Sequence, residues 1–133
     1  MKLSIVTAQF PTSADIARNF QCISQLMEQA KAQHADVVHF PEACLSGYAG
    51  SDLENYAGLD WQHLQALTQQ LIDLAGKLKL WTILGSVHPL SAPHKPYNSL
   101  YIINAEGQLI DRYDKRFCAG DASEQTDDLA HFT

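Results

Sequence analysis

The chain has 133 residues, of which 46% are hydrophobic and 18% are charged. That composition excludes an intrinsically disordered protein, and the length suits a single domain with a core of its own. Nine Lys and Arg residues against fifteen Asp and Glu residues give a formal net charge of −6. This balance argues against binding to nucleic acid or to an anionic membrane, because each of those surfaces attracts a basic patch.

The N-terminal apolar run is short and is interrupted by polar residues, so we interpret it as a strand rather than as a signal peptide. No other stretch reaches the roughly 20 apolar residues that a membrane-spanning helix needs. The three cysteines, Cys22, Cys44 and Cys118, are widely spaced and odd in number. They predict no disulfide framework, and the sequence therefore predicts a protein of the reducing cytoplasm.

The first half of the chain predicts a strand, a helix, a strand and a long loop. Residues 3–8 are β-branched and apolar, as in a buried strand. Thr12 with Asp15 three residues later suggests a capping box that opens a helix. One apolar helical face follows at Ile16, Phe20, Ile23, Met27 and Ala30. Residues 36–40 predict a second strand, and residues 41–60 predict a long structured loop of the kind that often carries function.

The second half predicts one more helix and three more strands. Residues 61–79 predict the helix, with leucines at steps of three and four: Leu64, Leu67, Leu71, Leu74 and Leu78. Residues 81–87 predict a third strand, and 98–103 and 109–113 predict a hairpin. We expect no regular element in 116–133. The order β-α-β-loop-α-β-β-β is an α/β pattern, in which each helix covers one face of a sheet.

Two charged residues follow predicted strands. Glu42 comes just after the second strand and behind Pro41, whose ring restricts the local backbone. Lys115 follows the last strand of the hairpin. Residues at strand ends in an open α/β sheet line the crevice where ligands bind. From position alone, solvated surface charges remain the alternative for Glu42 and Lys115, and only the fold could bring two such distant residues together.

Several short motifs occur in a specific order along the whole chain. They are Ala8-Gln9 in the first strand, Phe40-Pro41-Glu42, Leu45-Ser46-Gly47-Tyr48, Leu84-Gly85-Ser86, Tyr97-Asn98-Ser99 and Tyr113-Asp114-Lys115-Arg116. With this order and spacing the sequence resembles the nitrilase, or carbon–nitrogen hydrolase, superfamily. The resemblance implies an α-β-β-α sandwich and hydrolysis or condensation at the carbon–nitrogen bond of a non-peptide amide or nitrile.

The resemblance also implies a Glu-Lys-Cys catalytic set. Matched by motif, Glu42 would be the general base, Lys115 would stabilise the tetrahedral oxyanion, and Tyr48 would lie in the substrate site. Many members place a further glutamate after the lysine, for which Glu124 is the nearest candidate. A thiol with a pKa of about 8.5 is mostly protonated at pH 7, so a carboxylate must take its proton.

No metal or cofactor is expected, because the six histidines lack a ligand spacing and the sequence has no Gly-rich nucleotide-binding motif. The expected partner is a small amide or nitrile. Neither Cys22, in the first predicted helix, nor Cys44, only two residues past Glu42, is expected to replace the family's nucleophile. Attack on a substrate needs placement to within about an ångström.

The family's nucleophilic cysteine lies further along the chain than Thr133, so the resemblance implies that residues 1–133 form the N-terminal half of the domain, a truncated sandwich. Half a sandwich exposes strand edges and an apolar sheet face, which associate. We therefore predict a homo-oligomer in which a second copy covers that face. Light scattering at micromolar concentration should then give a mass above that of one chain.

Three hypotheses about function remain open at this stage. The first is a carbon–nitrogen hydrolase that is active in the complete protein or with a complementing chain. The second is a catalytically silent, self-associating interaction module or relic. The third is a rewired hydrolase that uses Cys118, three residues past Lys115, since a neighbouring lysine lowers the pKa of a thiol.

Overall fold

The computed structural model describes residues 1–116. Within them, the sheet has the strand order β1-β2-β3-β4-β5. The strands are β1 (Ile5–Thr7), β2 (Val37–His39), β3 (Trp81–His88), β4 (Tyr97–Ile103) and β5 (Leu109–Asp114). β1, β2 and β3 run parallel, whereas β4 and β5 continue the sheet as antiparallel neighbours of β3. The predicted order of elements is confirmed, and the structure differs from the sequence analysis by a residue or two at the ends of most elements.

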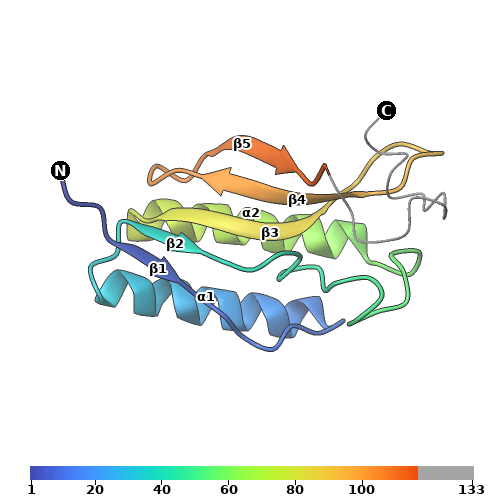
Figure 1. Cartoon of the computed structure of the whole chain (residues 1–133), viewed down its shortest axis with the longest axis horizontal. Helices are drawn as coiled ribbons and strands as arrows, with labels where there is room; N and C mark the ends of the chain where they lie inside the picture. The colour runs from blue at the N-terminus through green and yellow to red at the C-terminus, as the bar shows by residue number, and fades with distance from the viewer. Residues whose placement is uncertain (117–133) are drawn as a thin grey trace.

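Two helices, α1 (Ile16–Ala32) and α2 (Trp61–Leu78), lie alongside the sheet and contact each other (Figure 1). Each presents the apolar face that its spacing predicts. Together with alternate strand residues, these faces form one core, whose largest buried apolar side chains are Ile23, Met27, Val38, Phe40, Leu45, Leu71, Leu80, Leu84, Val87 and Ile103. The helices therefore cover one face of the sheet, and the strand ends are held in fixed positions by this core.

The start of α1 differs from the predicted capping box. Asp15 is the N-cap, and its side chain accepts a hydrogen bond from the backbone of Arg18 at 3.0 Å. The hydroxyl of Thr12 instead donates to Asp52 at 2.8 Å, which ties the segment after β1 to the long loop. A carboxylate caps a helix at least as well as a threonine hydroxyl, so the local competition favours Asp15.

The other face of the sheet carries exposed apolar side chains. Ile5, Trp81 and Tyr113 are 58%, 40% and 54% exposed, and Leu100 and Ile102 between them are half-buried. The strand register puts all five on the same side. An apolar face of this kind fits the half-sandwich expectation, while self-association stays a prediction. Across residues 1–116, no helix combines the length and the apolar character that crossing a membrane requires.

Candidate active site

Glu42 lies on a segment that crosses over β3. After β2, the amide of Phe40 donates to Ile83 at 2.9 Å, and the amide of Leu45 donates to Gly85 at 3.1 Å. A Cβ atom at Gly85 would lie 2.0 Å from the carbonyl oxygen of Pro41. The backbone around Glu42 can therefore lie against β3 only because position 85 has no side chain.

Lys115 is positioned by the end of β5. Its amide donates to the carbonyl oxygen of Asn98 at 2.8 Å, one step past the last strand residue. Its Nζ atom donates to Oε1 of Glu42 at 2.7 Å, although the two residues are 73 positions apart in the chain. The fold thus brings together the two charged residues that the sequence singled out.

The ion pair is only partly buried. The side chain of Lys115 is 28% exposed and that of Glu42 is 44% exposed. Pairs with this exposure contribute little to stability, on the order of 0–1 kcal/mol. The arrangement therefore places a carboxylate and an ammonium together at low cost, and its significance lies in the chemistry the two groups can perform.

Asn98 is a site residue that the sequence analysis did not identify. Its side-chain amide Nδ2 donates to Oε1 of Glu42, the same oxygen that accepts from Lys115. The motif Tyr97-Asn98-Ser99 marked the position, but nothing in the sequence indicated which of its three side chains points toward Glu42. That information depends on the register between β3 and β4, where Asn98 pairs with Val87.

Glu42 borders two cavities. One, of about 570 Å³, lies toward the end of β1 and is lined by Gln9, Phe10, Pro11, Thr12, Pro41, Glu42 and Tyr48. The other, of about 290 Å³, lies over β4 and β5 and includes Asn98, Tyr113 and Lys115. Tyr48 therefore lies in the wall of the first cavity, and its ring centroid is 5.9 Å from Nζ of Lys115. That distance is within the range of a cation–π contact.

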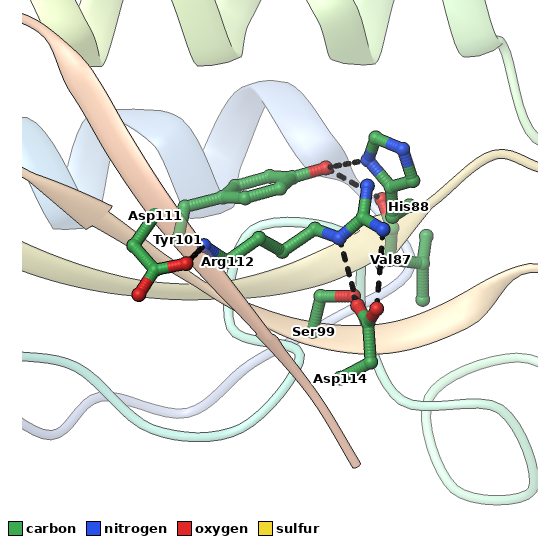
Figure 2. A network of polar contacts seen from close by, with 7 residues as sticks. All are labelled: Val87, His88, Ser99, Tyr101, Asp111, Arg112 and Asp114. Atoms are coloured by element: carbon green, nitrogen blue, oxygen red, sulfur yellow. Dashed lines mark hydrogen bonds and ion pairs between the residues drawn. The ribbon is translucent and has the colours of Figure 1, made fainter. Parts of the chain in front are cut away.

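A polar network fixes the end of β5 on its helix-facing side (Figure 2). Asp114 accepts hydrogen bonds from Ser99 at 2.6 Å and from Arg112 at 3.1 Å, and it forms an ion pair with Arg112. Next to it, His88 and the hydroxyl of Tyr101 are 2.9 Å apart. Burial raises the pKa of Tyr101 to about 12, so the hydroxyl keeps its proton. This network holds the residue that directly precedes Lys115.

The model of the carbon–nitrogen hydrolase family matches residues 2–127. The chain belongs to this family. It is 33% identical over 117 residues to a glutamine-dependent NAD(+) synthetase from Xylella fastidiosa, covering 87% of this chain and 20% of that protein. It is 30% identical over 116 residues to the nitrilase and fragile histidine triad fusion protein NitFhit from Drosophila melanogaster, covering 84% of this chain and 24% of the fusion protein.

Among solved structures, an amidase from Nesterenkonia sp. superposes with a TM-score of 0.78 at 19% identity. The match covers 90% of this chain and 44% of the amidase, and it confirms the expected fold, an α/β half of the nitrilase-type sandwich. Other structures of that amidase contain butyramide or acrylamide. The chain spans less than half the length of each of these relatives.

The cysteines in the described part of the chain, Cys22 and Cys44, do not complete a catalytic set. Cys44 is fully buried, and its Sγ donates to the carbonyl oxygen of Gly85 at 3.3 Å. Burial raises the pKa of Cys44 to about 12, so the thiolate is scarcely populated at neutral pH. Cys22 lies on α1 and lines neither cavity beside Glu42. The expectation that neither replaces the nucleophile is consistent with these positions.

Cys118 and Glu124 lie outside the described residues. The possible nucleophile of the third hypothesis and the expected second glutamate are therefore left as predictions. Across residues 1–116, no group of three or more His, Cys, Asp or Glu side chains is arranged to hold a metal ion.

We expect Cys44 to resist alkylation in the folded protein. Burial raises the pKa of the Cys44 thiol to about 12, so the thiolate is scarcely populated at pH 8, and the side chain is inaccessible. Iodoacetamide at pH 8, followed by peptide mass spectrometry, should leave Cys44 unmodified while the half-buried Cys22 reacts. Alkylation of Cys44 should appear once guanidinium unfolds the chain. Fast modification of Cys44 in the folded protein would contradict the buried placement.

Proposed function

We propose that Glu42 and Lys115 are the general base and the oxyanion-stabilising cation of a hydrolase that cleaves the carbon–nitrogen bond of small non-peptide amides or nitriles. The observation that carries the proposal is the 2.7 Å contact between Nζ of Lys115 and Oε1 of Glu42 beside two cavities. Membership of the carbon–nitrogen hydrolase family supports the class of reaction.

The chemistry follows from the two charges and a thiol. The carboxylate of Glu42 takes the proton of a cysteine thiol, and the resulting thiolate attacks the carbonyl carbon of the amide. The ammonium of Lys115 stabilises the negative charge that develops on the carbonyl oxygen. The carboxylic acid of Glu42 then protonates the departing amine, and water hydrolyses the thioester with Glu42 again as the base.

The nucleophile in this proposal comes from outside residues 1–116. Cys44 faces the core, hydrogen-bonded to Gly85, and Cys22 does not line the cavities. A cysteine brought in by further chain, or by a second chain, would have to reach the cavities next to Glu42. The exposed fraction of Glu42, 44%, leaves its carboxylate accessible to such a group.

The size of the cavities favours small substrates. At about 570 Å³ and 290 Å³, they fall within or below the usual range of small-molecule pockets. Tyr48 would contact the substrate as part of the wall of the larger cavity. The butyramide and acrylamide found with the Nesterenkonia amidase indicate short aliphatic amides as the first compounds to test.

The exposed apolar face of the sheet favours a second function, that of a self-associating module without catalytic activity. The apolar sheet face with Ile5, Trp81 and Tyr113 exposed is suited to association, and a silent self-associating module would use only that face. In such a module the contact between Glu42 and Lys115 would have no consequence for any substrate.

An amide-hydrolysis assay on the natural full-length protein separates the two functions. With butyramide, acrylamide and short nitriles, we expect release of ammonia and, by mass spectrometry of the quenched protein, an acyl adduct on one cysteine outside residues 1–116. A correctly folded full-length protein that turns over none of these compounds and forms no adduct would contradict the hydrolase and favour the module.

A further inference from the structure

The two donors that reach Glu42 bind the same oxygen atom. Nζ of Lys115 and Nδ2 of Asn98 donate to Oε1. Among residues 1–116, no donor binds Oε2. Because an ionised carboxylate only accepts hydrogen bonds, the side-chain amide of Asn98 must present its nitrogen to Glu42, which fixes the orientation of the amide.

We infer that Oε2 of Glu42 is the atom that takes the proton from the nucleophile. Asn98 is the positioning residue, because its hydrogen bond to Oε1 orients the carboxylate with Oε2 toward the nucleophile. The inference rests on the proposed function, in which Glu42 is the general base. Asn98 touches Glu42 and Lys115 and acts through them.

The two oxygen atoms of Glu42 differ in what happens when a proton arrives. Oε1 already accepts from two donors, one of them a cation, so a proton on this atom would displace at least one hydrogen bond. A proton on Oε2 leaves Oε1 as the carbonyl oxygen of the acid, which still accepts from Asn98 and from Lys115. Proton transfer to Oε2 therefore needs no rearrangement of the site, a condition that favours fast catalysis.

The step balances in atoms and charge. The S–H bond of the thiol breaks, an O–H bond forms on Oε2, and the electron pair stays on sulfur as the thiolate. The carboxylate of Glu42 becomes neutral while Lys115 keeps its proton. Once Glu42 is neutral, it attracts the ammonium less strongly, while the substrate's carbonyl oxygen acquires a negative charge. The same transfer therefore favours the interaction of Lys115 with that oxygen.

Asn98 is well placed for this role because it belongs to a regular strand. It pairs with Val87 in the β3–β4 ladder, and its carbonyl oxygen accepts the amide of Lys115 at 2.8 Å. The side chain of Asn98 thus contacts the proposed base, Glu42, while its carbonyl oxygen positions the backbone of Lys115. Side chains on strands hold their geometry more closely than side chains on loops.

The test compares two substitutions in the natural full-length protein. Asn98→Leu removes the donor at similar size, and Asn98→Asp replaces it with an acceptor. A hydrogen bond to a charged group is worth roughly tenfold to a hundredfold in rate, so we expect kcat for the amide to fall by about that factor in Asn98→Leu, with KM unchanged. Asn98→Asp should lose more, because two carboxylates would then face each other.

The control is a second asparagine with a purely structural environment. Asn104 is buried in the turn between β4 and β5, where its Oδ1 accepts from the amides of Glu106 and Gln108. Asn104→Ala should lower the melting temperature without changing kcat of the folded enzyme. A rise in KM at constant kcat in Asn98→Leu would overturn the inference, because it would place Asn98 on the substrate.

A second measurement does not depend on activity. In the ¹⁵N spectrum of the wild-type protein, one side-chain amide proton of Asn98 should be displaced downfield by the carboxylate, and Glu42→Gln should move it back. An undisplaced resonance would overturn the inference whether or not the protein is active. A displaced resonance in a protein that hydrolyses no amide would contradict the proposed function and, with it, the catalytic role of Asn98, while establishing the contact.

Discussion

Glu42→Gln should lower kcat for a small amide by about a thousandfold in the full-length protein. A positioned general base contributes typically 10²- to 10⁴-fold, and the amide of Gln cannot accept the thiol proton. The fold should be unaffected, since the side chain is 44% exposed and its ion pair is of little energetic weight. Ammonia release and the melting temperature, measured on the same preparation, check the two parts of this expectation.

The matched control for Glu42→Gln is Glu28→Gln, which makes the same chemical change at an exposed position on α1. Glu28→Gln should leave both kcat and the melting temperature unchanged. Lys115→Met should lower kcat as well, because it removes the cation beside the reacting carbonyl oxygen. If Glu42→Gln hydrolysed amides at the rate of the wild type, Glu42 would not be the base, and the proposed roles would be wrong.

Gly85→Ala should destabilise the fold by about 3 kcal/mol or more. The added Cβ would lie 2.0 Å from the carbonyl oxygen of Pro41 and 2.7 Å from the amide nitrogen of Ala43. These are backbone atoms, so no side-chain rotation can relieve the clash, and the segment that carries Glu42 must move away from β3. Urea unfolding followed by circular dichroism measures the change in the free energy of unfolding.

Gly58 offers the comparison for Gly85. A Cβ atom at Gly58 meets nothing within 4 Å, and its φ is outside the left-handed region. Gly58→Ala should therefore change the free energy of unfolding by no more than about 0.5 kcal/mol. Equal stabilities of Gly85→Ala and Gly58→Ala would show that the segment around Glu42 does not depend on close approach to β3.

Periodicity was sufficient to predict the elements and their order. The apolar steps of three and four identified the core faces of α1 and α2, and the short β-branched runs identified the strands. Polar residues within these patterns were missed. Asn19 lies fully buried on α1, where its Nδ2 donates to the carbonyl oxygens of Ser13 and Leu45. Partners 26 residues away, such as Leu45, have no signature in a helical repeat.

The contact between the two charged residues of the candidate site was foreseen only in outline, and their catalytic roles stay predictions. Positions at strand ends, together with the family resemblance, pointed to Glu42 and Lys115, and the fold brings them together. Asn98 and Gly85 each belonged to a recognised motif, yet their roles depend on register and on chain crossing. The side chain of Asn98 reaches Glu42 from β4. Gly85, on β3, leaves room for the backbone on either side of Glu42. Contacts of this kind join segments that are distant in the sequence, so the sequence of one segment alone does not predict them.

The partial exposure of Glu42 and Lys115 makes the proposed catalysis depend on the predicted self-association. In water the attraction between two unit charges is weak, and salt at physiological strength screens it over about 8 Å. A surface packed onto the apolar face next to the pair would expel that water and lower the local dielectric constant, which strengthens every charge interaction in the site. The rate would then become less sensitive to salt as the protein assembles, so ionic strength reports on whether the reactive groups are enclosed.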